Sequence, residues 1–101
     1  MTMKLRRMSF PASVSVSSNN IDWSLGNVFK KSISTNITFT FSNQSDGRTI
    51  VFKLTNTTGS ALTLAWPASV TNADTTLPAN SSKLFSLIMV DTNIHMTSVS
   101  V

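Results

Sequence analysis

Asp91 and His95 flank the last turn of the chain, at a spacing that would let a carboxylate orient an imidazole beside a serine. A carboxylate, an imidazole and a serine hydroxyl grouped in this way are typical of hydrolase active sites. The remaining acid and base groups are few, because the chain has one histidine, four aspartates, and no glutamate, cysteine or tyrosine. Seventeen serines also make a chance Asp-His-Ser grouping common. We therefore predict that the protein is not an enzyme and has no catalytic residue.

Metal and cofactor sites are not indicated either. A single histidine with scattered aspartates has no recognisable metal-ligand spacing, and thiolate ligands are absent. The three glycines, Gly26, Gly47 and Gly59, stand alone and form no phosphate-binding loop. We expect no cofactor and no metal.

Two tryptophans raise the alternative of a carbohydrate-binding or receptor-binding adhesin module, because an indole ring is a stacking platform for a sugar. Trp23 and Trp66 both lie within or beside apolar rows, so core packing is the favoured interpretation. A host-surface glycan stays open as a partner, and the ligand-binding residues are unknown.

The charge is concentrated at the start of the chain. Of a formal net charge of +4, three positive charges lie in the first seven residues, and the body is nearly neutral. Charge combined with apolar side chains ahead of Pro11 predicts an arm that orders on a neighbouring protein, with a solvated terminus as the alternative. The predicted anchoring residues are Lys4, Arg6, Arg7, Met8 and Phe10. We expect no nucleic-acid partner.

The order of apolar residues along the sequence does not indicate a targeting signal. Met8 to Ser18 alternates apolar residues with serine instead of forming the continuous apolar run of a signal peptide. No stretch approaches the roughly 20 apolar residues of a membrane-spanning helix. We expect no signal peptide and no membrane partner.

The elements that must position these groups are strands. Serine, threonine and asparagine fill forty of the 101 positions, and such residues favour strands and turns over helices. Apolar residues alternate with polar ones in Asn36 to Ser42, Thr49 to Asn56 and Leu62 to Trp66. The predicted core comprises Phe39, Phe41, Phe52, Leu54, Leu64, Trp66, Phe85 and Leu87.

Leu84 to Val90 is apolar on both faces, interrupted only by Ser86. Such a strand is covered on both sides, and a domain of this size has too few residues to cover both. We therefore predict that copies of the chain associate through an interface that contains Leu84, Ser86, Ile88 and Val90.

Turn residues separate the strands at intervals of about 8 to 12 residues, which is typical of a sandwich or jelly roll. The predicted fold is all-β: a single antiparallel β-sandwich or jelly roll of seven to eight short strands. Residues 1–18 form an N-terminal arm and first strand, and residues 19–101 form the β-sandwich domain.

Three short sequence words occur in a distinctive order: Leu25-Gly26-Asn27-Val28, Thr38-Phe39-Thr40-Phe41-Ser42-Asn43, and Trp66-Pro67-Ala68-Ser69-Val70. This order resembles small β-sandwich modules of bacteriophage tail-fibre and virion structural proteins, over about Asp22 to Thr97. The resemblance implies that the copies form a homotrimer, in place of the commoner dimer, and that this homotrimer is located in the virion. It favours a bacteriophage virion structural protein, attached to a larger particle assembly as an accessory, decoration or fibre/tip component.

Overall fold

The computed structural model describes residues 13–101, and in this range the protein is all-β. One 3-10 turn, η2 (Trp23–Leu25), is the single helical element of that range. No helix in the described range is long and apolar enough to cross a membrane. The predicted division of the chain at residue 18 stays a prediction.

Eleven strands form in the described range, and four of them have only two residues. Their bounds are β1 (Val14–Ser15), β2 (Asn20–Asp22), β3 (Val28–Ile33), β4 (Ile37–Thr38), β5 (Thr40–Ser42), β6 (Thr49–Asn56), β7 (Leu62–Ala65), β8 (Val70–Thr71), β9 (Thr76–Leu77), β10 (Ser82–Val90) and β11 (Asn93–Ser100).

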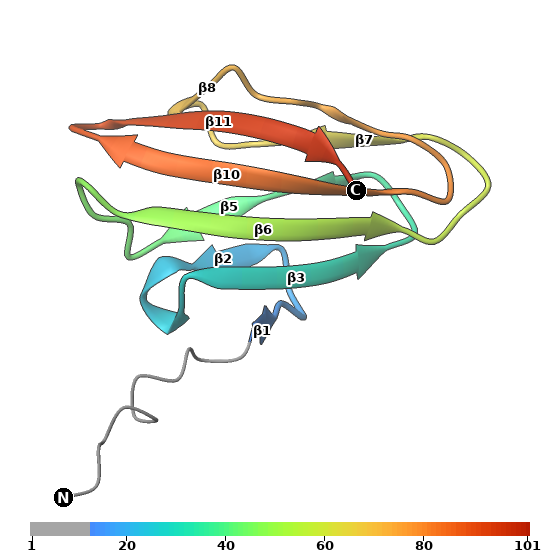
Figure 1. The fold of residues 1–101 in the computed structure, drawn as a ribbon, viewed down its shortest axis with the longest axis horizontal. Helices are drawn as coiled ribbons and strands as arrows, with labels where there is room; N and C mark the ends of the chain where they lie inside the picture. The colour runs from blue at the N-terminus through green and yellow to red at the C-terminus, as the bar shows by residue number, and fades with distance from the viewer. Residues whose placement is uncertain (1–12) are drawn as a thin grey trace, which may run out of the picture.

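The chain winds as a β-solenoid of about three turns. One layer is a six-stranded sheet in the order β1-β3-β6-β10-β11-β8 (Figure 1). The other layer contains a two-stranded sheet, β2-β5, and a three-stranded sheet, β4-β7-β9. Successive turns pair in parallel, so that Val28 lies beside Val51, 23 residues later, and Ile37 lies beside Leu64. Each turn therefore contributes strands to both layers, and the turn that begins with β3 contributes two, β4 and β5, to the second layer.

A C-terminal hairpin is inserted into this coil. Strands β10 and β11 are antiparallel to each other, β10 is antiparallel to β6, and β11 is parallel to β8. The hairpin thus separates β6 from β8, which would otherwise be neighbouring turns (Figure 1). After β8 the chain reverses through β9, which pairs antiparallel with β7.

The predicted antiparallel sandwich or jelly roll is therefore wrong, although the all-β class is confirmed. Short breaks between alternating segments are compatible with hairpin turns and also with turns between layers. In the structure, the turn before β6 and the turn after it each carry the chain to the other layer, so the next strand in the same sheet runs in the same direction. Alternation identifies a strand but is identical for both directions of pairing.

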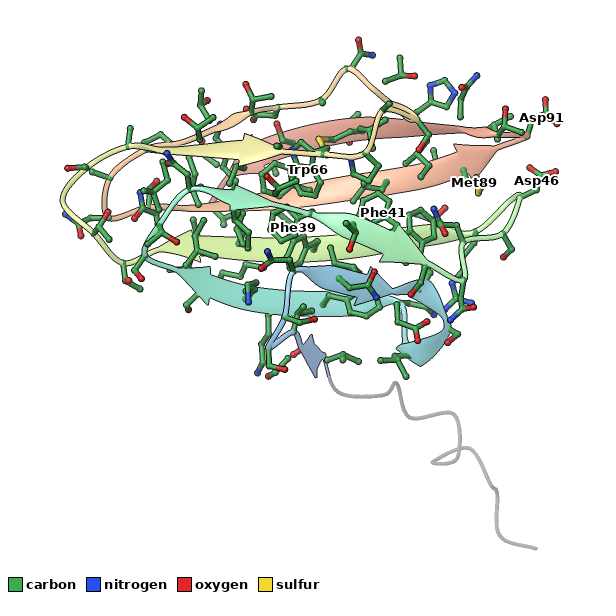
Figure 2. The ribbon with its side chains drawn as sticks, turned by 180° about the vertical axis from the view of Figure 1, so that it is seen from behind. Phe39, Phe41, Asp46, Trp66, Met89 and Asp91 are labelled. Atoms are coloured by element: carbon green, nitrogen blue, oxygen red, sulfur yellow. The ribbon has the colours of Figure 1, made fainter. Side chains whose placement is uncertain are left out.

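The core lies between the two layers and confirms the predicted apolar rows. Six of the eight predicted core residues are buried: Phe39, Phe52, Leu54, Leu64, Phe85 and Leu87. The other two, Phe41 and Trp66, are half-buried and pack against this cluster. Figure 2 shows Phe39, Phe41 and Trp66 grouped in the middle of the molecule. The Trp66 ring stacks on Phe39 with centroids 4.6 Å apart and an interplanar angle of 22°.

Candidate interaction face

The two residues of the candidate hydrolase grouping are not joined. The Asp91 backbone N–H donates a hydrogen bond to Asp46 Oδ1 (2.8 Å), while His95 lies on the exposed side of β11, in register with Ile88. Figure 2 shows Asp46 and Asp91 together at one end of the molecule. Within residues 13–101 no three histidine, aspartate or glutamate side chains gather where they would hold a metal ion.

Both tryptophans belong to the interior. Trp23 is fully buried, and its ring meets Phe41 edge-on with centroids 5.5 Å apart. The Trp66 indole Nε1–H donates a hydrogen bond to the backbone oxygen of Asp74 (2.8 Å). Trp23 therefore has no exposed ring for a sugar, and Trp66 has its polar edge and one ring face in use.

The most distinctive surface is the outer face of the six-stranded sheet. Along β10, Phe85 and Leu87 are buried, and the four residues predicted as an interface alternate with them on the opposite side. Leu84 and Ser86 are half-buried, whereas Ile88 and Val90 are exposed to 40% and 47%. The structure therefore brings Leu84, Ser86, Ile88 and Val90 to one face, while their role as an interface stays a prediction.

Neighbouring strands extend this apolar surface. In-register pairing forms a row from β3 to β11 that consists of Val28, Val51, Ser86 and Thr97. The next row contains Lys30, Lys53, Leu84 and Val99. Valines thus appear on both sides of β10, and Val28 and Val99 are 44% and 56% exposed. We call the outward side chains of β3, β6, β10 and β11 the outer face.

A shallow apolar hollow lies near one end of the outer face. Its volume is about 210 Å³. It is lined by Thr49, Ser86, Leu87, Ile88, His95 and Thr97. The wall is largely apolar, so a side chain of similar character would fill it with little loss of hydration.

The opposite part of the outer face is basic. Lys30 on β3 and Lys53 on β6 are exposed register partners, and Ser15 on β1 continues their row. Lys31 lies on the alternate side of β3, and its Nζ donates a hydrogen bond to the backbone oxygen of Val16 (3.1 Å). The face therefore combines an apolar centre on β10 with a basic border beside β1.

The predicted anchoring arm, with Lys4, Arg6, Arg7, Met8 and Phe10, lies outside the described residues. The described chain begins at Ser13, directly before β1, which is the edge strand of the six-stranded sheet. In sequence, the arm is thus joined to the basic border of the outer face.

Sequence reasoning identifies the β10 part of this face but misses the valines and lysines beside it. Alternation marks Val51 and Lys53 as outward residues of their strand, yet their neighbours depend on strand order.

Comparison of the chain with protein families, with curated proteins and with solved structures found no match.

Proposed function

We propose that the protein is a non-enzymatic structural module that associates with copies of itself through its outer face, as a small component of a bacteriophage virion. The observation that carries this proposal is the apolar centre of the outer face, where Leu84, Ile88 and Val90 have no covering layer within residues 13–101. Exposed apolar patches on small proteins are typical of association surfaces.

A homotrimer suits this geometry. Around a threefold axis, each copy presents two different parts of its surface to its two neighbours. The outer face has apolar residues on both sides of β10, because Val28 and Val51 lie on one side and Val99 on the other. Three such faces turned toward a common axis would cover one another, and the closed arrangement leaves no surface for fibre growth.

The virion assignment rests on the sequence resemblance. An accessory, decoration or fibre/tip role agrees with a predicted arm that precedes an edge strand. The arm residues Lys4, Arg6, Arg7, Met8 and Phe10 would attach the module to another virion protein.

The association is tested by the mass of the purified protein in solution. We expect a trimer by multi-angle light scattering at micromolar concentration, and a monomer for Ile88→Lys, because three buried ammonium groups would have no partner. The control is Thr38→Lys, which places the same charge on the exposed side of β4 in the other layer. Leu87 is unsuitable for this test, since it is fully buried and a charge there would unfold the chain.

A monomeric wild-type protein, or an Ile88→Lys protein that stays trimeric, would overturn the proposed interface.

The virion role is tested separately: antibodies against this chain should label purified phage particles from the host culture that produces them. A chain that begins at Ser13 should fold and form trimers but fail to join particles. Full incorporation of that shorter chain would show that the arm is not the anchor.

A further inference from the structure

Lys30 and Lys53 are directly opposite each other on neighbouring parallel strands. Like charges in this position repel each other and destabilise a sheet. Beside them is a hollow of about 290 Å³ that crosses β1, β3 and β6. Its lining residues are Ser15, Val16, Lys30, Lys31, Ser32, Lys53 and Thr55. An unfavourable charge pair therefore adjoins a space that has room for a ligand.

The other cations of the described range are engaged. Lys83 forms the single ion pair found within residues 13–101, with Asp74, and Arg48 Nη2 donates hydrogen bonds to Gly26 O (2.7 Å) and Asn27 Oδ1 (3.1 Å). Among those same residues, no carboxylate lies within ion-pair distance of Lys30 or Lys53. Their charge is thus available to a ligand.

The lining indicates the chemistry of that ligand. Ammonium groups attract an anion, and the hydroxyl groups of Ser15 and Ser32 add neutral hydrogen-bond donors, whereas the Thr55 hydroxyl is hydrogen-bonded to Ser82 Oγ (2.8 Å). No aromatic residue of the described chain lines the hollow, so neither a nucleobase nor a sugar ring has a stacking surface there. Lys30 and Lys53 lie side by side at one space instead of following a track along the sheet, which fits one compact anionic group.

We propose that the hollow beside β1 binds an oxyanion, namely a phosphate or sulfate group, either free or as an ester on a glycan. The anion lies between the Lys30 and Lys53 ammonium groups and converts their repulsion into attraction. Lys31, held at the sheet edge by Val16 O, adds a third positive charge to the border. The site is separate from the apolar hollow at Ile88, but Lys53 is the register partner of Leu84, so the oxyanion site borders the proposed interface between copies.

The affinity and stoichiometry of oxyanion binding are measured by isothermal titration calorimetry of the full-length protein. Sodium sulfate and sodium phosphate are the ligands, and sodium chloride at equal ionic strength is the control. We expect saturable binding of one oxyanion per chain. Lys53→Gln should weaken it about tenfold, because one charge-assisted contact is lost. Lys53→Arg keeps the charge and should bind.

Net charge is controlled by the double variant Lys53→Gln with Asp46→Asn, which has the wild-type net charge. The amide oxygen that the second substitution introduces can still accept the hydrogen bond that the Asp91 backbone N–H donates to Asp46 Oδ1 in the wild type. We expect this variant to bind as weakly as Lys53→Gln, and Asp46→Asn alone to bind like the wild type. Wild-type affinity in the charge-matched double variant would show that binding follows net charge. Wild-type affinity in a variant with both Lys30→Gln and Lys53→Gln would show that the anion binds to the arm. Either result would overturn the site.

Sulfated dextran and neutral dextran distinguish the free ion from the ester. Tight binding of sulfated dextran that free sulfate displaces and Lys53→Gln abolishes would assign a glycan ester; binding of the free ions with no gain from the polymer would assign the ion itself. A single-stranded DNA oligonucleotide that binds more tightly than both would indicate a nucleic-acid track and overturn the single-group site. Absence of any saturable binding would overturn it as well.

Discussion

The ammonium group of Lys83 lies 2.7 Å from Oδ2 of Asp74, and the same oxygen accepts a hydrogen bond from Ser98 Oγ at 2.7 Å. Asp74 belongs to the segment in which the chain reverses between β8 and β9, whereas Lys83 and Ser98 belong to the inserted hairpin. The carboxylate therefore joins the hairpin to the coil, at the point where the regular winding ends.

Acid should loosen this connection. Burial raises the pKa of Asp74, but hydrogen bonds from Lys83, Ser98 and Thr76 outweigh that effect and hold its pKa below the ordinary value. A depressed folded-state pKa contributes stability that is present above the unfolded-state pKa, about 3.9, and is lost as the pH falls through the folded-state pKa. We therefore expect the urea concentration at the unfolding midpoint to decrease as the pH is lowered below about 4.

The matched variant is Asp74→Asn. At pH 7 it should lower the free energy of unfolding by about 1–3 kcal/mol, because the Lys83 ammonium loses its counter-charge while half-buried. In acid the two proteins should become equally stable, since the wild-type carboxyl is then neutral too. A variant whose deficit stays constant from pH 7 to pH 2 would show that the charge of Asp74 is unimportant.

Asn56→Asp should be strongly destabilising. The Asn56 side chain is 1% exposed, and its Nδ2 donates to the backbone oxygens of Ser60, Leu77 and Pro78 at 2.8, 3.2 and 3.0 Å. A carboxylate would face these oxygens without a proton to donate. We expect a cost of about 3 kcal/mol, measured by urea unfolding at pH 7.

The control is Asn36→Asp. Asn36 is exposed, and its Oδ1 accepts a hydrogen bond from Thr63 N at 2.9 Å, a role that a carboxylate oxygen also fills. This variant should be nearly as stable as the wild type. Equal costs at both positions would mean that the donor role of Asn56 contributes little.

Phe52→Ala should remove about 3–5 kcal/mol of stability. Phe52 is fully buried and meets the rings of Phe39 (5.3 Å) and Trp66 (6.3 Å) edge-on. Its truncation opens a cavity between the two layers. Val51→Ala, one residue earlier on the outer face, is the control and should cost much less in a monomeric background such as Ile88→Lys, as measured by thermal and urea unfolding.

Lys53→Gln should stabilise the protein when no oxyanion is present. Removing one of two opposed ammonium groups relieves repulsion worth about 0.2–1 kcal/mol. The gain should appear in chloride buffer of low ionic strength and shrink in high salt, which screens exposed charges. A loss of stability under these conditions would mean that Lys53 packs favourably against its neighbours and is not a cost to the sheet.

Much of the local structure was predictable from alternation alone. The row Ile50, Phe52 and Leu54 is buried as predicted, and the same parity places Asn56 inside, where its amide satisfies backbone groups. The inward and outward sides of Leu84–Val90 also follow from alternation. Asn56 is thus a buried polar residue that the parity of its strand could have revealed.

The sequence by itself determined that β6 and β10 are strands and which side of each faces the core, because burial of apolar side chains acts with a period of two along an extended chain. The seven to eight predicted strands are eleven in residues 13–101, because two-residue strands such as β8 and β9 form by pairing with distant partners. Only the tertiary structure decided the direction and order of the strands: the solenoid winding, the hairpin inserted between β6 and β8, and the register that places Lys30 beside Lys53. Strand alternation has no direction, and a partner 23 residues away is selected by how two layers close over a shared core rather than by any local pattern.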